Sequence, residues 1–168
     1  MSKVIFALSL SLFCISGCTH PGNVAGVSGE IEPNIISIYA QYAPVKIDVL
    51  PLTEFNTNQE TGQSEINLYI RLLDSYNSEI KSPCIFRFEL YPRVERSSQV
   101  KGGRVMIWPD MNLINAKANN EYWQAYLRAY EFHLPFEPKP GQVYILEVTC
   151  MCLNNTRITS EFSLKTLE

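Results

Sequence analysis

Three cysteines beyond residue 80 carry the side chains most able to do chemistry. Cys150 and Cys152 are separated by one residue in an apolar stretch, which places both on one face of a strand, about 6.6 to 6.8 Å apart with parallel Cβ vectors. That geometry disfavours a bond between them, so Cys84 is the cysteine with which either could form a disulfide. Buried free thiols are an equal alternative, and a metal site that combines thiols with His133 is a third.

His133 is the only histidine beyond residue 20, so any catalytic arrangement that needs an imidazole must use it. Its neighbours Glu131 and Leu134 provide no serine or cysteine nucleophile at a recognisable spacing. We therefore expect that the protein is not an enzyme, with no catalytic residues, no cofactor and no bound metal.

The first 18 residues have the organisation of a bacterial export signal. Lys3 supplies a positive charge, and Val4 to Phe13 is an uncharged, mostly apolar run, too short to cross a bilayer, which needs about 20 apolar residues. The segment ends in Ile15-Ser16-Gly17-Cys18, with small residues directly before the cysteine. It resembles the lipobox of bacterial lipoproteins. The resemblance implies that residues 1–17 are a lipoprotein signal peptide, and that Cys18 becomes the lipidated N-terminus, carrying diacylglyceryl on sulfur and a fatty acid such as palmitate on the amine.

Residues 18–34 follow as the lipidated cysteine and a stretch rich in glycine, proline and serine, which predicts a flexible tether. In Gram-negative lipoprotein sorting, an aspartate directly after the cysteine retains the protein in the inner membrane, whereas this chain has Thr19. The resemblance therefore implies a cell-envelope protein anchored to a membrane through Cys18. The outer membrane is favoured, with the domain facing the periplasm or the cell surface.

Length and charge limit the classes of partner. Removing 17 residues from the 168 leaves 151, enough for one domain with a substantial core. The net charge of -3 includes Lys3, the only charged residue of the leader, so the processed chain carries -4. This acidic balance argues against nucleic acid as a partner. A hydrophobic content of 46% indicates a globular chain rather than a disordered one.

Alternating apolar residues predict the core strands. Residues 66–72, 84–90 and 158–164 alternate between apolar and other side chains, and 143–153 is the most apolar run of the chain after the leader. Asn154-Asn155 between the last two runs suits a tight hairpin turn. These patterns favour an all-β architecture.

The predicted fold is a single antiparallel β-sandwich of about seven strands, formed by residues 35–168, either immunoglobulin-like or transthyretin-like. We expect its first strand at Ile35 to Tyr39, followed by an edge strand from Val45 to Phe55 that Pro51 interrupts. The aromatic and turn pattern of residues 66–164 loosely resembles Ig-like domains of bacterial lipoproteins. That resemblance assigns no functional residues.

Four aromatic residues, Trp108, Tyr122, Trp123 and Tyr126, are the candidate binding residues. They could form a platform on which a sugar stacks, although large aromatics in a sandwich more often belong to the core. The spacing predicts a short helical turn around Asn120 to Ala125 and then a strand. We expect Trp123 to close the end of the sandwich and Tyr122 to be more exposed, with the outer surface of this segment as the contact site.

Two functions from different classes fit the sequence. The first is a structural or protein-interaction module of the cell envelope, held at the membrane by lipid on Cys18, with an envelope protein as partner; small lipoproteins with transthyretin-like sandwiches serve secretion machines in this way. The alternative is a carbohydrate-binding module that uses surface aromatics on a polysaccharide. A buried aromatic cluster with a protruding loop would favour protein contact, and an exposed, planar cluster would favour sugar.

Overall fold

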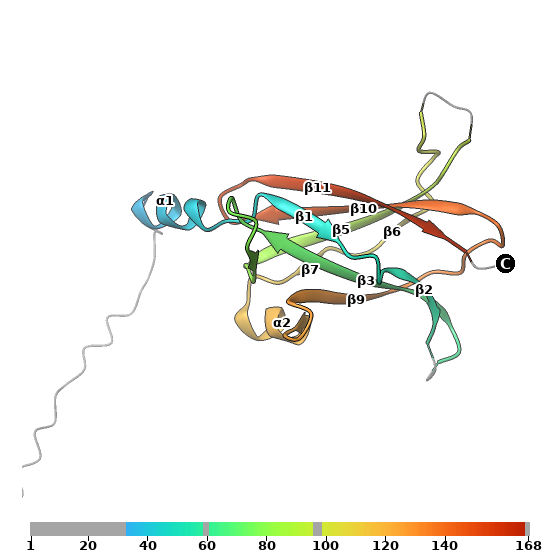
Figure 1. The fold of residues 1–168 in the computed structure, drawn as a ribbon, viewed down its shortest axis with the longest axis horizontal. Helices are drawn as coiled ribbons and strands as arrows, with labels where there is room; N and C mark the ends of the chain where they lie inside the picture. The colour runs from blue at the N-terminus through green and yellow to red at the C-terminus, as the bar shows by residue number, and fades with distance from the viewer. Residues whose placement is uncertain (1–32, 59–60, 96–98, 167–168) are drawn as a thin grey trace, which may run out of the picture. The chain divides into compact units, whose positions relative to one another are not determined.

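The structure is a computed structural model that describes residues 33–58, 61–95 and 99–166 (Figure 1). The described residues belong to one compact unit, Ile31–Glu168. The predicted signal peptide, Cys18 and the predicted tether as far as residue 32 lie outside the described residues. All the strands below fall within the predicted domain, 35–168.

Sheet A contains six strands, all antiparallel to their neighbours. They are β1 (Lys46–Val49), β2 (Glu54–Thr57), β3 (Ser64–Leu73), β4 (Glu79–Ile80), β8 (Trp123–Gln124) and β9 (Ala129–Pro135). The order is β1-β3-β9-β8, with β2 and β4 also paired to β3. β3 is therefore the central strand of this sheet.

Sheet B contains five strands, again antiparallel. They are β5 (Cys84–Pro92), β6 (Met106–Ile107), β7 (Met111–Asn112), β10 (Val143–Cys152) and β11 (Arg157–Lys165). The order is β11-β10-β5-β6, and β7 pairs with the other end of β5. β10 lies between β5 and β11, as its apolar sequence predicts for a central strand.

The two sheets share one hydrophobic core, which confirms the predicted all-β sandwich. On β3 the inward side chains are Ile66, Leu68, Ile70 and Leu72, and all four are fully buried. The opposing residues of β5, at positions 84, 86, 88 and 90, are also fully buried. Since successive side chains of a strand point to opposite faces, this alternation leaves polar residues on the outer faces.

The described residues form eleven strands against the predicted seven, because two strands are interrupted and counted twice, and because β4 and β8 are additional strands of two residues each. β1 and β2 pair with residues 70–73 and 64–67 of β3, so together they form one edge strand that is broken between Val49 and Glu54. The break contains Pro51, which confirms the predicted interruption. β6 and β7 likewise pair with residues 89–90 and 85–86 of β5.

The predicted first strand at Ile35 to Tyr39 is wrong, because these residues lie in helix α1 (Pro33–Gln41). Pro33 suits the first helical position, where its missing N–H would be unsatisfied in any case. The Tyr39 hydroxyl lies 3.0 Å from Ser82 Oγ and donates to the carbonyl of Pro83 at 3.3 Å. Among the described residues, no helix is both long and apolar enough to cross a membrane.

The helical turn predicted around Asn120 to Ala125 is wrong for most of its length, because the second helix ends at Glu121, and Trp123 and Gln124 belong to β8. Helix α2 (Ala116–Glu121) starts after Asn115, whose side chain accepts hydrogen bonds from the backbone N–H groups of Lys117 and Ala118. An N-cap of this kind satisfies donors that the first helical turn leaves unpaired. The strand expected after the helix is confirmed as β9, and the Asn154-Asn155 turn is confirmed by a positive φ of 61° at Asn155.

Candidate functional site

The predicted aromatic platform does not form as a single surface. Trp108 is only 8% exposed; its indole N–H donates to the carbonyl of Pro135 at 3.1 Å, and its ring packs at 6.5 Å against Phe136. Tyr126, by contrast, is 79% exposed. These two candidates therefore differ in environment, and Trp108 is a core residue.

Tyr122 and Trp123 are both half-buried and pack against the core. Tyr122 stacks on Phe132 with ring centroids 5.1 Å apart and planes inclined by 26°. Trp123 meets Tyr130 edge to face at 5.1 Å. Trp123 therefore packs against the core, and Tyr122, which we expected to be more exposed than Trp123, is likewise half-buried with its ring on Phe132.

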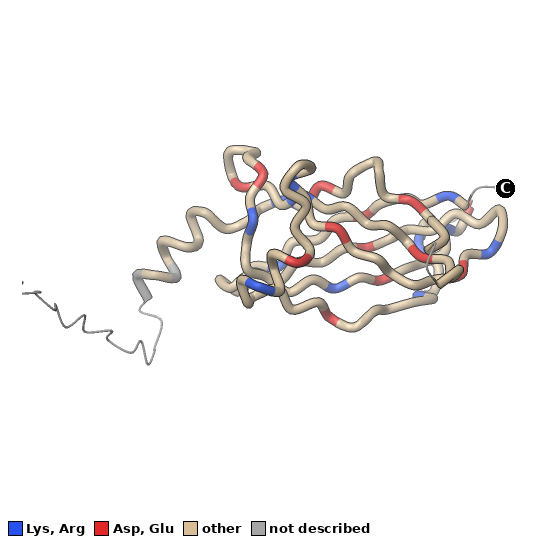
Figure 2. The backbone as a smooth tube through the Cα atoms, turned by 90° about the horizontal axis from the view of Figure 1, so that it is seen from below, with Lys and Arg blue, Asp and Glu red and all other residues tan. Residues whose placement is uncertain are grey.

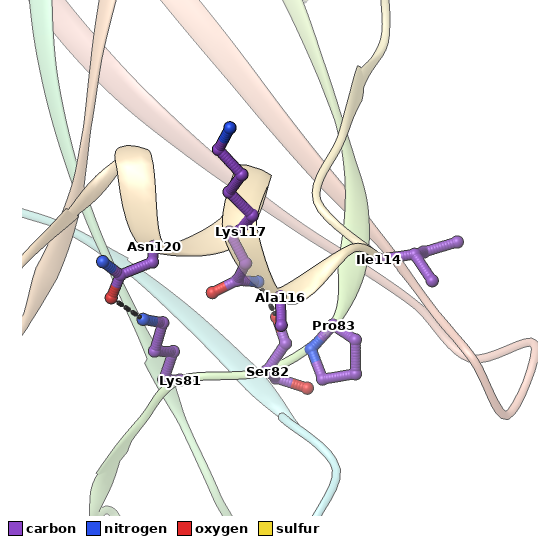
Figure 3. Close-up of a pocket in the computed structure, with 8 residues that line it drawn as sticks. Lys81, Ser82, Pro83, Ile114, Ala116, Lys117 and Asn120 are labelled. Carbon is purple, nitrogen blue, oxygen red and sulfur yellow. Dashed lines mark hydrogen bonds between the residues drawn. The ribbon is translucent and has the colours of Figure 1, made fainter.

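A groove lies between α2 and the segment that joins β4 to β5 (Figure 3). Its volume is about 620 Å³, and it is lined by Lys81, Ser82, Pro83, Ile114, Ala116, Lys117, Asn119 and Asn120. Lys81 donates from Nζ to Asn120 Oδ1 at 2.7 Å across one side of the groove (Figure 3). The lining combines small and apolar side chains with two lysines, so the groove is open, weakly basic and free of carboxylates.

The polar groups below this groove are used in the fold. Asn119 donates from Nδ2 to the carbonyls of Ser82 and Leu113, both at 2.9 Å. The Tyr130 hydroxyl accepts from Ser82 N–H at 3.0 Å, and the Ser82 carbonyl and Asn119 Oδ1 both lie within 3.1 Å of it as acceptors. Burial raises the pKa of Tyr130 above its ordinary value. These polar groups therefore form hydrogen bonds within the fold and hold the segment before β5 in place.

The three cysteines form a buried cluster at the start of β5 and the end of β10. Cys84 and Cys152 are direct partners across the two strands, and Cys150 Sγ lies 4.0 Å from Cys152 Sγ. All three are free thiols in the structure. A hydrogen bond with Cys150 and burial raise the pKa of Cys152, which keeps its thiol protonated and unreactive.

A metal site that combines these thiols with His133 is wrong, because the residues lie in different environments. The cysteines face the core, whereas His133 is an exposed residue of β9. Within the described ranges, no group of three or more His, Cys, Asp and Glu residues is arranged to hold a metal ion.

Of the two cysteines that could form a disulfide with Cys84, the strand register places Cys152 directly opposite it.

We expect three reactive thiols from Cys84, Cys150 and Cys152 after unfolding without reductant, and very slow reaction before unfolding, because burial protects all three and the raised pKa further protects Cys150 and Cys152. Thiol titration measures this directly, either in the processed protein with Cys18 acylated or in a variant with both Cys14→Ser and Cys18→Ser, which has no thiol in the leader. Cys84→Ser should lower the count by one. A single reactive thiol in the unfolded, unreduced wild type would show that two of the three are bonded, and a rise to two thiols in Cys84→Ser would identify Cys84 as one of them.

A polar strip on β3 and β9 is the part of the surface that the sequence did not indicate. His133 Nδ1 lies 2.9 Å from Asn67 Oδ1 and 3.2 Å from Glu65 Oε1. Its Nε2 lies 3.7 Å from Glu131, which accepts a hydrogen bond from the Tyr69 hydroxyl at 2.8 Å. The strip pairs acidic and neutral groups around one imidazole, and its members contain no serine or cysteine nucleophile.

Alkaline pH should destabilise the protein through Tyr69. Burial and the hydrogen bond to Glu131 raise the pKa of Tyr69 from 10.0 to about 12. The folded state therefore holds a proton that the unfolded state releases, so this contribution is complete below about pH 10 and is lost as the pH rises towards 12. In denaturant unfolding at a series of alkaline pH values, the free energy of unfolding should fall less steeply for Tyr69→Phe than for the wild type.

Glu131→Gln is the control for this titration, because it removes the charge beside Tyr69 and keeps a hydrogen-bond acceptor. It should give a slope between those of the wild type and Tyr69→Phe. Equal slopes for the wild type and Tyr69→Phe would contradict the role of Tyr69.

The fold defines this chain as an all-β sandwich domain whose surface offers an open groove, a polar strip and one strongly exposed aromatic among the predicted four. No protein-family model matches the chain, and no curated protein or solved structure is significantly similar to it.

Proposed function

We propose that this protein is a lipoprotein of the bacterial cell envelope, anchored through lipid on Cys18, whose sandwich acts as a protein-interaction module rather than as an enzyme. The lipobox-like segment Ile15 to Cys18 supports the anchor and, with Thr19 after it, an outer-membrane location. The observation that carries the interaction role is the packing of Trp108, Tyr122 and Trp123 against the core, which removes three of the four aromatics from a sugar platform.

We further propose that the sandwich is immunoglobulin-like rather than transthyretin-like. Counting β1 with β2 and β6 with β7, one sheet has the order β1/β2, β3, β9, β8 and the other has β11, β10, β5, β6/β7. This corresponds to strands A, B, E and D facing G, F and C, with one further strand beside C.

The contact surface that we propose is formed by residues 93–95 and 99–105, the described parts of the hairpin between β5 and β6, which extend beyond the sheets (Figure 1). Arg93 pairs with Lys101 by an isolated bridge, and Val94 N–H donates to the carbonyl of Val100 at 2.8 Å. Val94 and Val100 are both exposed. The base of the hairpin is held by ion pairs of Lys101 with Glu147 and Glu161, the latter at 2.6 Å. Apolar side chains on a braced projection suit a partner protein.

The test compares two variants of the tagged, full-length lipoprotein purified from membranes. Val94→Asp with Val100→Asp should abolish recovery of a specific envelope protein, because charge is introduced into the proposed contact. Leu52→Asp changes an exposed apolar residue in the turn between β1 and β2 and should preserve recovery. Loss of the partner in both variants, or in neither, would contradict the hairpin as the contact.

One observation supports the carbohydrate-binding alternative. Tyr126 is 79% exposed and borders a shallow depression of about 200 Å³ together with Glu54, Asn67 and Tyr69. An exposed aromatic ring beside carboxylate and amide groups can stack on a sugar and bond its hydroxyls. Affinity electrophoresis through gels that contain envelope polysaccharide should then show retardation that Tyr126→Ala abolishes.

A further inference from the structure

Helix α1 exposes an apolar face that nothing in the described chain covers. Ile35 and Ile38 are 58% and 52% exposed and lie three residues apart on one side of α1, and Tyr42, which directly follows the helix, is 71% exposed. No charged residue occurs from position 33 to position 45, and Figure 2 shows the described part of α1 without an acidic or basic position. An apolar helix face is normally covered by another element or by a membrane surface.

The helix touches the sandwich through Tyr39. The Tyr39 hydroxyl contacts Ser82 and Pro83, and both of these residues line the groove beside α2. Burial raises the pKa of Tyr39, in keeping with a side chain that is packed rather than free. Tyr39 lies next to Ile35 and Tyr42, from which it is four and three residues away, yet its contact leaves the side chains of Ile35, Ile38 and Tyr42 exposed.

The same end of the sandwich carries further exposed apolar side chains and several lysines. Ile114 borders the groove that Tyr39 reaches through Ser82 and Pro83, and it is exposed. Lys81 and Lys117 line that groove, and Lys46 follows α1 at the start of β1; all three are exposed. Glu79 of β4 is acidic, but it forms ion pairs within 4.0 Å with two arginines, Arg71 and Arg128. Apolar and aromatic side chains flanked by lysines are typical of surfaces that contact a bilayer interface.

We propose that this end of the domain, called the α1 face and comprising Ile35, Ile38, Tyr42 and Ile114 with Lys46, Lys81 and Lys117, rests on the lipid bilayer that holds the anchor. The proposal depends on lipidation of Cys18 in the proposed function. Only 14 residues lie between Cys18 and Pro33, a step of 15 positions, so α1 can begin no more than about 50 Å from the anchored residue even along a fully extended chain.

Proximity to the anchor makes this bilayer contact feasible with a small apolar face. Once Cys18 is in the membrane, contact of α1 with the same bilayer becomes an intramolecular step with a high effective concentration. Tyr42 matches the preference of tyrosine for the membrane interface, and the lysines attract anionic headgroups. The domain would then contact the bilayer through the α1 face, and the hairpin between β5 and β6 would be available to a partner protein.

The test uses the full-length lipoprotein in vesicles of phosphatidylethanolamine and phosphatidylglycerol, with or without bromine on the acyl chains as a quencher. Ile38→Trp adds a fluorophore on the α1 face, and Val105→Trp adds one at an exposed apolar position between β5 and β6. Trp108 and Trp123 are present in both variants and in the wild type, so the fluorescence of the wild type can be subtracted from that of each variant. Brominated lipid should reduce the added fluorescence of Ile38→Trp about twofold, since interfacial side chains reach the acyl boundary, and leave that of Val105→Trp unchanged.

Mass spectrometry of the same preparations separates the two proposals. Unquenched fluorescence of Ile38→Trp with lipid present on Cys18 would overturn the α1 face and leave the proposed function intact. Absence of lipid on Cys18 would overturn the proposed function itself. A third outcome would also overturn bilayer contact: the added tryptophan is shielded from aqueous acrylamide in native membranes but not in vesicles that contain the lipoprotein and no other protein. Another protein would then cover α1.

Discussion

Cys18→Ser is expected to move the protein from the membrane fraction to the soluble fraction, with at least a tenfold loss of membrane-bound protein, about the difference between multiple acyl chains and none. Serine has no thiol to accept the diacylglyceryl group, and the processing that the lipobox implies depends on this first step. The α1 face alone offers a small apolar area, so any remaining association should be weak. Incorporation of labelled palmitate and fractionation after a high-salt wash measure both consequences.

Cys14→Ser is the matched control, since it removes the other cysteine of the leader without touching the segment Ile15 to Cys18. It should incorporate palmitate and remain in the membrane fraction. Labelled fatty acid in Cys18→Ser, or membrane association of that variant that resists high salt, would show that the lipobox interpretation is wrong. Equal loss in both variants would place the anchoring chemistry elsewhere in the leader.

The core strands were predictable because their pattern is local. In β3 and β5, every second residue is apolar, and a strand sends alternate side chains to opposite faces, so the sequence itself specifies which side is buried. The break at Pro51 and the turn at Asn155 were predictable for the same reason, since each depends on the backbone of one residue.

Helix α1 and the polar strip were not predictable from such local patterns. A short apolar run with several isoleucines fits a strand as well as a helix, and what positions α1 is the contact of Tyr39 with Ser82, 43 residues away. His133 was visible in the sequence, but its neighbours Glu65 and Asn67 come from β3, more than 60 residues earlier. Their proximity depends on the pairing register of β3 with β9, which the separate strand patterns leave open.

The aromatic candidates Trp123 and Tyr126 differ in burial for a related reason. Trp123 and Tyr126 are only three residues apart, yet Trp123 lies in β8, paired with β9, whereas Tyr126 lies in the turn that follows. Pairing with β9 brings the Trp123 ring onto Tyr130. Hydrophobicity alone assigns both residues to the same class, and the strand pairing decides which one packs.

Trp123→Ala is expected to lower the free energy of unfolding by about 3 kcal/mol, the lower end of the range for large aromatic truncations, because the side chain is partly exposed. The substitution removes the edge-to-face contact with Tyr130 at 5.1 Å and the ring over which Lys81 Nζ lies at 5.7 Å. It also opens the core beside the buried Tyr130 ring. Urea unfolding followed by circular dichroism measures the change.

Tyr126→Ala is the matched control, since it truncates an aromatic residue of the same segment that is 79% exposed. Its free energy of unfolding should stay within about 0.5 kcal/mol of the wild type. Tyr122→Ala should resemble Trp123→Ala, because its ring stacks on Phe132. If Trp123→Ala and Tyr122→Ala both unfold like the wild type, these rings do not support the core. They would then be available to a ligand, and the carbohydrate-binding alternative would replace the protein-interaction module as the better account of this segment.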